Sequence, residues 1–211
     1  MVYKVISKLL SSRLKVILPE IISHHQSAFI LGRLIIDNIL LAYECIHIMK
    51  KKKGKRGLCA VKLDMHKAYD RVEWIFLEKI MTKLGFDRRW MNLIMACVKS
   101  VKFRVRFNSI ETDTISPTRG LRQGDPLSPY LFLLVAEGLS CMLKGAEERG
   151  ELEGVKVCRE APVISYLLFT DDSLILMHAN KKNADCLSDI LNRYCANSGQ
   201  KAREAKSSIY F

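Results

Sequence analysis

Apolar side chains recur at intervals of three and four residues in six stretches of the chain, which is the spacing that places them on one face of a helix. The pattern predicts helices over residues 2–18, 37–53, 71–84, 88–99, 127–148 and 182–196. Residues that cap or break helices are expected to set their ends. These residues are Pro19, Asp37, Gly54, Gly85, Asp87 and Gly199.

Strands are predicted where apolar runs are short or alternate strictly with polar residues. Residues 59–63 form such a short run and should make a buried strand that ends at Asp64. Residues 102–108 alternate basic and apolar side chains, which predicts a strand with one buried and one cationic face. Two apolar runs within residues 163–178 flank four polar residues and predict a hairpin. With a last strand at 209–211, the order of elements predicts an α+β fold with a mostly antiparallel sheet.

The composition indicates a folded globular protein, with 211 residues of which 49% are apolar and 27% charged. This balance argues against a disordered, collagenous or coiled-coil chain. The longest apolar run, residues 130–136, is too short to span a bilayer, and the N-terminus does not resemble a signal peptide. The seven cysteines form no CxxC pair, which fits a reducing compartment. We therefore expect a nuclear or cytoplasmic protein with no membrane partner and no secretion.

The net charge of +12 is distributed unevenly along the chain. Residues 1–57 hold 11 basic and 3 acidic side chains, residues 58–120 hold 12 and 7, and residues 121–211 hold 11 and 12. A basic front and a nearly neutral back suggest that a polyanion lies on one part of the molecule. The lysine run at 50–53 has a simpler interpretation, because such runs commonly form a solvated helix end.

Three aspartates are candidates for chemistry. Asp171 and Asp172 form the tip of the predicted hairpin, and two carboxylates held together there repel each other unless a cation neutralises them. Mg²⁺ takes such oxygen ligands. If the strand that ends at Asp64 is a neighbour of the hairpin, three carboxylates could hold two Mg²⁺ ions about 4 Å apart. Simpler roles stay open, because Asp is a common turn residue and Asp64 or Asp70 can cap a helix.

The loop RGLRQGDPLSP, residues 119–129, is the other candidate site. Its glycines permit the backbone to approach a ligand closely, and the helix start that follows favours a phosphate. A simple connection into a capped helix would use similar residues. The loop by itself therefore leaves ligand binding and plain connection as equal alternatives.

In combination, these segments resemble the reverse transcriptase domain of non-LTR (LINE-type) retrotransposons, of the kind abundant in plant genomes. YKVISKLLSSRL and QSAFILGRLIIDNILLAYE are similar to segments of the family's fingers. KLDMHKAYDRVEW resembles polymerase motif A, RGLRQGDPLSPYLF motif B, LLFTDDSLIL motif C and SGQKAREAKSS motif D. The resemblance implies partial helical fingers at 1–56 and a polymerase-type palm at 57–211, in which helices pack on an antiparallel sheet, with no thumb.

The resemblance also implies roles for the acidic site. Asp64, Asp171 and Asp172 match the three catalytic aspartates that hold two Mg²⁺ ions, and the backbone carbonyl of Met65 should lie near the second ion. The aspartates should converge from adjacent antiparallel strands. Tyr69 matches the steric gate, an aromatic residue that favours deoxynucleotides, and should face the site rather than the core.

Further residues are implied to bind substrates. The incoming nucleotide would be lined by residues of motif B, namely Gln123 and Gly124 with Arg122 beside them. Phe169 should pack beside the catalytic turn. Lys206 is the expected motif D lysine, a proton donor to the pyrophosphate leaving group, and Lys201 is the second choice.

The implied activity is that of an RNA-directed DNA polymerase, with two-metal nucleotidyl transfer to a primer 3′-hydroxyl. Its partners would be an RNA template, a DNA primer and deoxynucleoside triphosphates. The sequence departs from the family pattern at Leu31, Thr170 and Arg203, where proline, alanine and asparagine are usual.

Two alternatives to an active polymerase remain. The matched segments begin inside the fingers and stop before a thumb, so the chain could be an inactive retrotransposon remnant that at most binds nucleic acid. For the isolated chain we expect salt-sensitive RNA and DNA binding with little polymerase activity. An RNA-binding module unrelated to polymerases would need exposed stacking aromatics, whereas most aromatics here lie in apolar runs.

Overall fold

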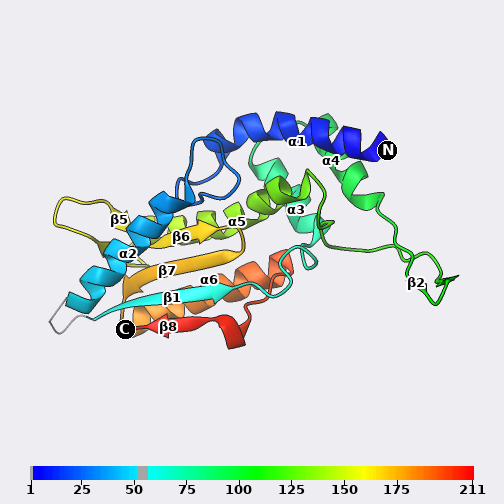
Figure 1. The fold of residues 1–211 in the computed structure, drawn as a ribbon. Helices are drawn as coiled ribbons and strands as arrows, with labels where there is room; N and C mark the ends of the chain where they lie inside the picture. The colour runs from blue at the N-terminus through cyan, green and yellow to red at the C-terminus, as the bar shows by residue number, and fades with distance from the viewer. Residues whose placement is uncertain (1, 52–56) are drawn as a thin grey trace.

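The computed structural model describes residues 2–51 and 57–211, and Figure 1 shows a long N-terminal helix lying along one end of a layered body. The helices are α1 (Val2–Ile21), α2 (Ile35–Lys51), α3 (Trp74–Lys83), α4 (Arg88–Lys99), α5 (Ser128–Glu148), α6 (Lys181–Ser198) and the short 3₁₀ helix η1 (Glu204–Lys206). The strands are β1 (Leu58–Asp64), β2 (Arg106–Phe107), β3 (Ile110–Glu111), β4 (Val155–Lys156), β5 (Val163–Ile164), β6 (Tyr166–Phe169), β7 (Asp172–His178) and β8 (Ser208–Tyr210). This mixture confirms the predicted α+β class.

The main sheet has the strand order β6-β7-β1-β8, and every neighbouring pair is antiparallel. The β1–β7 ladder begins with Leu58 opposite His178 and ends with Asp64 opposite Asp172. The predicted hairpin is confirmed as β6–β7. Its first apolar run is divided, however, because β5 pairs with β4 in a separate two-stranded ladder. The terminal strand is confirmed as β8, which lies along β1 (Figure 1).

The central strand β1 separates two hydrophobic cores, because its successive side chains point to opposite faces of the sheet. Cys59, Val61 and Leu63 face the larger core, which is built mainly from α1, α3, α4, α5 and α6. Leu58 and Ala60 face a smaller core that α2 covers. Because both faces of β1 are buried, its sequence is a nearly continuous apolar run, which is the pattern that predicted a buried strand at residues 59–63.

Helix α5 is the central element of the larger core, with thirteen buried residues along its length. It packs against α3 and α6, and Phe76 of α3 meets Tyr194 of α6 edge-on at 6.0 Å. By length and composition α5 could cross a membrane, but 67% of its most apolar window is buried inside the molecule. Such burial is typical of a helix in a protein core.

The prediction of a half-buried strand at 102–108 is wrong. Only Arg106 and Phe107 form a strand there, and they pair with β3 in a small hairpin. Phe103, Val105 and Phe107 are 43%, 53% and 72% exposed. Strict alternation shows that the two faces of a strand differ, but it does not show that another element covers the apolar face.

Several helix ends also differ from the prediction. Pro19 does not stop α1 at once: a proline removes one helical hydrogen bond and crowds the preceding turn, and the helix ends two residues later at Ile21. Asp37 lies inside the first turn of α2, and the expected stop at Gly54 falls outside the described residues. Helix α3 begins only at Trp74 rather than at residue 71. Asp87 is confirmed as the cap of α4 and Gly199 as the left-handed end of α6.

Candidate active site

Three carboxylates meet at one end of the main sheet. Asp64 is the last residue of β1, and its cross-strand partner in the ladder is Asp172, the first residue of β7. Asp171 precedes Asp172 in the two-residue turn between β6 and β7. The expected convergence from adjacent antiparallel strands is therefore confirmed, although Asp64 and Asp172 are more than a hundred residues apart in the sequence.

The three carboxylates influence one another electrostatically. Burial raises the pKa of the Asp171 carboxyl, and the neighbouring carboxylates of Asp172 and Asp64 raise it further. Within residues 2–51 and 57–211, no Lys or Arg side chain forms a salt bridge with any of the three. The same residues contain no ready-made cluster of three metal-ligating side chains. The three carboxylates therefore concentrate negative charge at this end of the sheet. Their side chains would have to come together around a cation to bind it.

The segment after α6 runs beside Asp64 and holds its backbone. The Arg203 amide donates to the Asp64 carbonyl at 2.8 Å, and the His66 amide donates to the Lys201 carbonyl at 2.8 Å. Met65, between them, forms a bridge with Ala202. Carbonyls alternate in direction along an extended strand, so the Met65 carbonyl points to the side of β7, where the hairpin turn lies. This is the position in which a backbone oxygen could serve as a metal ligand.

Tyr69 lies between the core and the carboxylates. Its half-buried ring stacks on Phe132 of α5, with centroids 4.9 Å apart. Burial raises the pKa of its hydroxyl, and the Asp171 carboxylate raises it further, so the hydroxyl end lies within electrostatic reach of the site. Tyr69 therefore packs against α5 through its ring, near enough to Asp171 for that carboxylate to raise the pKa of its hydroxyl.

Three hydrogen bonds to backbone carbonyls join residues 69–74 to the loop before α5. The Leu121 amide donates to the Tyr69 carbonyl at 2.8 Å, and the Gly120 amide donates to the Val72 carbonyl at 2.8 Å. The Trp74 indole donates to the Gly120 carbonyl at 2.8 Å. The two segments approach so closely that only glycine fits at position 120, where φ is +91°. This contact sets the loop beside the carboxylate end of β1.

Gln123 and Gly124 follow this contact in the exposed part of the loop. The Gln123 amide nitrogen lies 3.5 Å from an Asp70 carboxylate oxygen, a long hydrogen bond that points the side chain toward the segment after β1. Gly124 adopts a left-handed conformation with φ of +78° and open space around it. Both residues are therefore available to a ligand between the loop and β1. Among the described residues, the helix that follows Asp64 and Asp70 has Glu73 at its N-cap position, so neither aspartate has the simpler capping role there.

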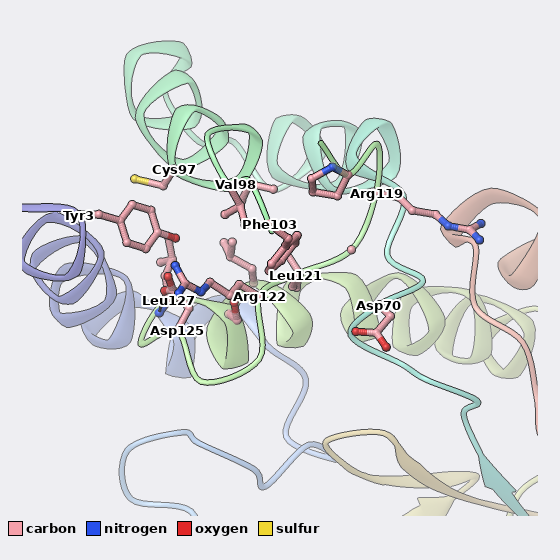
Figure 2. A pocket seen from close by; sticks show the side chains of 15 residues that line it. Tyr3, Asp70, Cys97, Val98, Phe103, Arg119, Leu121, Arg122, Asp125 and Leu127 are labelled. Carbon is pink, nitrogen blue, oxygen red and sulfur yellow. Dashed lines mark hydrogen bonds between the residues drawn. The ribbon is translucent and has the colours of Figure 1, made fainter. Parts of the chain in front are cut away.

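Arg122 points in another direction, toward α1. Its guanidinium lies 5.8 Å from the centre of the Tyr3 ring, next to a cavity of about 210 Å³ (Figure 2). Burial and the nearby Asp125 carboxylate raise the pKa of the Tyr3 hydroxyl. Asp125 itself accepts from the Leu127 amide at 2.8 Å and from the Ser7 hydroxyl. These contacts fasten the start of α5 to the N-terminal helix.

A model of one protein family covers the whole chain. Residues 1–211 match the model described as reverse transcriptase (RNA-dependent DNA polymerase). The chain belongs to the reverse transcriptase family. Relatives place it among non-LTR retrotransposon proteins, as the resemblance of its motifs implied.

Two retrotransposon relatives match most of this chain. It is 30% identical to the uncharacterized 149 kDa protein of transposon TX1 from Xenopus laevis over 206 residues, which cover 98% of this chain and 15% of that protein. It is 32% identical to the Pol polyprotein of retrotransposable element R2 from Nasonia vitripennis over 165 residues, 78% of this chain and 15% of the polyprotein. The chain thus spans about a seventh of the length of these relatives.

Solved telomerase structures share the fold. The Candida albicans telomerase, solved with a fragment of telomeric RNA, aligns with a TM-score of 0.67 at 11% identity, over 98% of this chain and 35% of that one. Apo telomerase from Candida tropicalis lacking its C-terminal domain aligns with a TM-score of 0.66 at 15% identity, over 97% and 40%. Both are consistent with the expected polymerase fold of palm and fingers.

Phe169, Lys206 and Lys201 are the remaining residues that the motif resemblance implied. Phe169 is the cross-strand partner of Asp172 at the hairpin turn and is 37% exposed. It lines a cavity of about 270 Å³ between α2 and the sheet. Lys206 is exposed at the end of η1. Lys201 is also exposed and lies opposite His66, beside a separate hollow. Both lysines are on the segment that pairs with β1.

Sequence reasoning missed one residue at the site. Gln26, in the loop between α1 and α2, is buried, and its side chain accepts a hydrogen bond from the backbone amide of Thr170 in the turn between β6 and β7. The only signal for it is a polar amide followed at once by a run of small and apolar residues, QSAFIL. That pattern is typical of a buried polar side chain, which needs a hydrogen-bond partner, but it does not indicate which group the partner is.

Proposed function

We propose that this reverse transcriptase chain is the catalytic core of an RNA-directed DNA polymerase, which extends a primer 3′-hydroxyl with deoxynucleotides on an RNA template. The observation that carries the proposal is the cross-strand pair of Asp64 and Asp172, with Asp171 beside it in the turn. Residues 1–56 would form part of the fingers and residues 57–211 the palm. The protein would act in the nucleus or the cytoplasm.

Reverse transcriptases generally use divalent metal ions, and the donor set at this site fits such ions. Carboxylate oxygens are hard ligands, and no salt bridge within the described residues neutralises these three. Asp64, Asp171 and Asp172 would hold two Mg²⁺ ions, with the Met65 carbonyl near the second. Ions held there would stabilise charge on the attacking and leaving oxygens of the transfer.

The neighbouring residues would position the substrates. Tyr69, stacked on Phe132, would present a rigid edge to the sugar and exclude a 2′-hydroxyl. Gln123 and Gly124 would line the nucleotide from the loop, with Arg122 beside them, anchored on α1 through Tyr3.

Two further elements would complete the site. Phe169 would support the primer side of the turn, beside Asp172. Lys206, or in second place Lys201, would donate a proton to the leaving pyrophosphate.

Primer extension tests the proposal. The purified chain is given an RNA template with an annealed DNA primer, deoxynucleotides and Mg²⁺, and RNA binding is measured in parallel. Weak extension by the natural chain, which Asp171→Asn abolishes, is the expected result. Asp189→Asn, which changes an exposed carboxylate on α6, is the matched control and should extend normally. RNA binding without extension in any variant would instead identify an inactive nucleic-acid-binding remnant.

A further inference from the structure

The segment that contains Gln26 forms an additional edge of the main sheet. Gln26 makes a parallel bridge with Leu168 of β6. The Leu168 amide donates to the His25 carbonyl at 2.8 Å, and the Ser27 amide donates to the Leu168 carbonyl at 3.3 Å. The side-chain amide of Asn38, from α2, donates to the His25 and Leu168 carbonyls at 3.2 and 3.1 Å. The fingers segment is thus bound to the strand that leads into the catalytic turn.

The side chain of Gln26 extends this attachment to the turn itself. It is 1% exposed, and its carbonyl oxygen accepts from the Ala28 amide at 3.0 Å and from the Thr170 amide at 3.3 Å. Two backbone donors on one atom fix the orientation of the amide, because only its oxygen can accept from both. The nitrogen has no hydrogen-bond partner within the part of the chain that is described. Gln26 therefore acts through its oxygen.

Thr170 needs an external support of this kind. Its φ is +56°, in the left-handed region that β-branched residues rarely occupy. Strained conformations persist where the surrounding structure holds them in place. The residues that follow Thr170 directly are Asp171 and Asp172, so any relaxation of the threonine would move both carboxylates.

The support is itself rigid. The Arg33 guanidinium donates to four backbone carbonyls at distances up to 3.1 Å, one at the end of α1 (Pro19) and three in the loop that carries Gln26 (Ile22, Ser23 and Gln26). The buried Glu137 of α5 accepts from the Ser23 amide at 2.9 Å. Because these hydrogen bonds restrain the loop, it can keep the Gln26 side chain against the Thr170–Asp171 turn.

We propose that Gln26 is a positioning residue that locks the Thr170–Asp171 turn, so that the three carboxylates are set for cation binding by a side chain from the fingers segment. The proposal rests on the function proposed above. It adds a mechanical link: displacement of residues 23–28 would loosen the carboxylate site without any change in the three aspartates themselves.

Amide hydrogen exchange at Thr170 tests the link without any need for activity. Gln26→Met keeps the length of the side chain but removes the acceptor, and Gln26→Glu keeps an oxygen in the accepting position. We expect the Thr170 amide to exchange about tenfold faster or more in Gln26→Met and at close to the natural rate in Gln26→Glu. Ile30→Val, which trims a buried side chain of the same segment, is the control for general loosening and should leave Thr170 protected. Unchanged exchange in Gln26→Met, or equal acceleration in Ile30→Val, would overturn the proposal.

Cation binding provides the second readout, with Mn²⁺ alone as the probe. Gln26→Met should weaken Mn²⁺ binding by about tenfold, since loss of a residue that orients metal-binding side chains costs roughly 10- to 100-fold in metal affinity. Gln26→Glu should bind at least as tightly as the natural chain, and Ile30→Val should bind equally. If the natural chain binds no more Mn²⁺ than Asp171→Asn, the proposed metal function fails, and the exchange measurement at Thr170 still decides the role of Gln26.

Discussion

Gly120 lies against the backbone of Asp70 so closely that a β-carbon on the glycine would sit 2.8 Å from the Asp70 carbonyl oxygen. This contact joins the loop before α5 to the segment after β1, and it positions Gln123 beside Asp70. The approach is closer than a side chain at position 120 allows, and the φ of +91° adds a second requirement for glycine.

Gly120→Ala should therefore destabilise the protein by about 2 kcal/mol or more, from backbone strain and displacement of the loop together. Urea unfolding measures the loss. Gly150→Ala is the matched control, because Gly150 also has a positive φ, +67°, but has open space around it. That variant should lose only about 1 kcal/mol. Equal losses in the two variants would show that the contact with Asp70 contributes nothing.

Asp171→Asn should stabilise the metal-free protein at neutral pH. The folded state raises the pKa of Asp171 above its ordinary value of 3.8, so ionisation of this carboxyl costs folding free energy at any pH above the raised pKa. The gain from Asp171→Asn should shrink as the pH falls through the folded pKa and should vanish below 3.8. Thermal unfolding of both proteins across this pH range gives the difference. Added Mg²⁺ should reverse the order at neutral pH, because only the natural chain keeps all three carboxylates.

Thr170→Asn should also stabilise the protein, by about 1 kcal/mol, because asparagine tolerates the left-handed conformation better than a β-branched residue. The measurement is the shift in the midpoint of thermal unfolding. Thr118→Asn, at an exposed loop position without a positive φ, should change stability very little. A loss of stability in Thr170→Asn would mean that contacts of the threonine side chain stabilise the fold by more than its left-handed backbone conformation destabilises it.

In a complete enzyme that carries this motif, Tyr69→Ala should increase incorporation of ribonucleotides relative to deoxynucleotides in primer extension, because it removes the ring that would meet a 2′-hydroxyl. Loss of the stack on Phe132 should also destabilise the fold by about 3 kcal/mol. Tyr69→Phe keeps the ring and should keep the sugar preference. An unchanged preference in Tyr69→Ala would make the tyrosine a packing residue only.

RNA affinity should fall steeply as salt increases, because the net charge of +12 is concentrated in the first 120 residues and binding releases condensed counterions. Lys102→Gln with Arg106→Gln, in the exposed segment that leads into and forms β2, should reduce the slope of log affinity against log salt by about 1 to 2 if both contact phosphates. The control pair Lys156→Gln with Lys181→Gln removes the same charge from the neutral back half. Identical slopes for the two pairs would mean that the hairpin does not touch the RNA.

The elements that depend on local pattern were predictable from the sequence. The apolar run before Asp64 and the two runs around Asp171 mark strands wherever they occur, and Asp87 and Gly199 act through bonds within a few residues of themselves. The convergence of the aspartates was predictable because each lies at a strand end and because the segments resemble polymerase motifs.

The features that depend on distant partners were not predictable. Nothing near residue 102 indicates that its strand would lack a covering layer, since the cover would come from elsewhere in the chain. The acceptor role of Gln26 and the close contact of Gly120 each require a backbone atom that is far away in the sequence. A single sequence shows the residue types at such positions but not their partners.

The strand order of the main sheet has a consequence for how the site forms. Hairpin β6–β7 can close early, because its two strands are adjacent in the sequence, whereas β1 pairs only with β7 and β8, both of which follow more than a hundred residues later. Contacts of such long sequence separation pay a large loop-closure entropy and form late. A nascent or partly refolded chain would thus carry Asp171 and Asp172 without Asp64, and a cation bound by all three carboxylates would report that folding is complete.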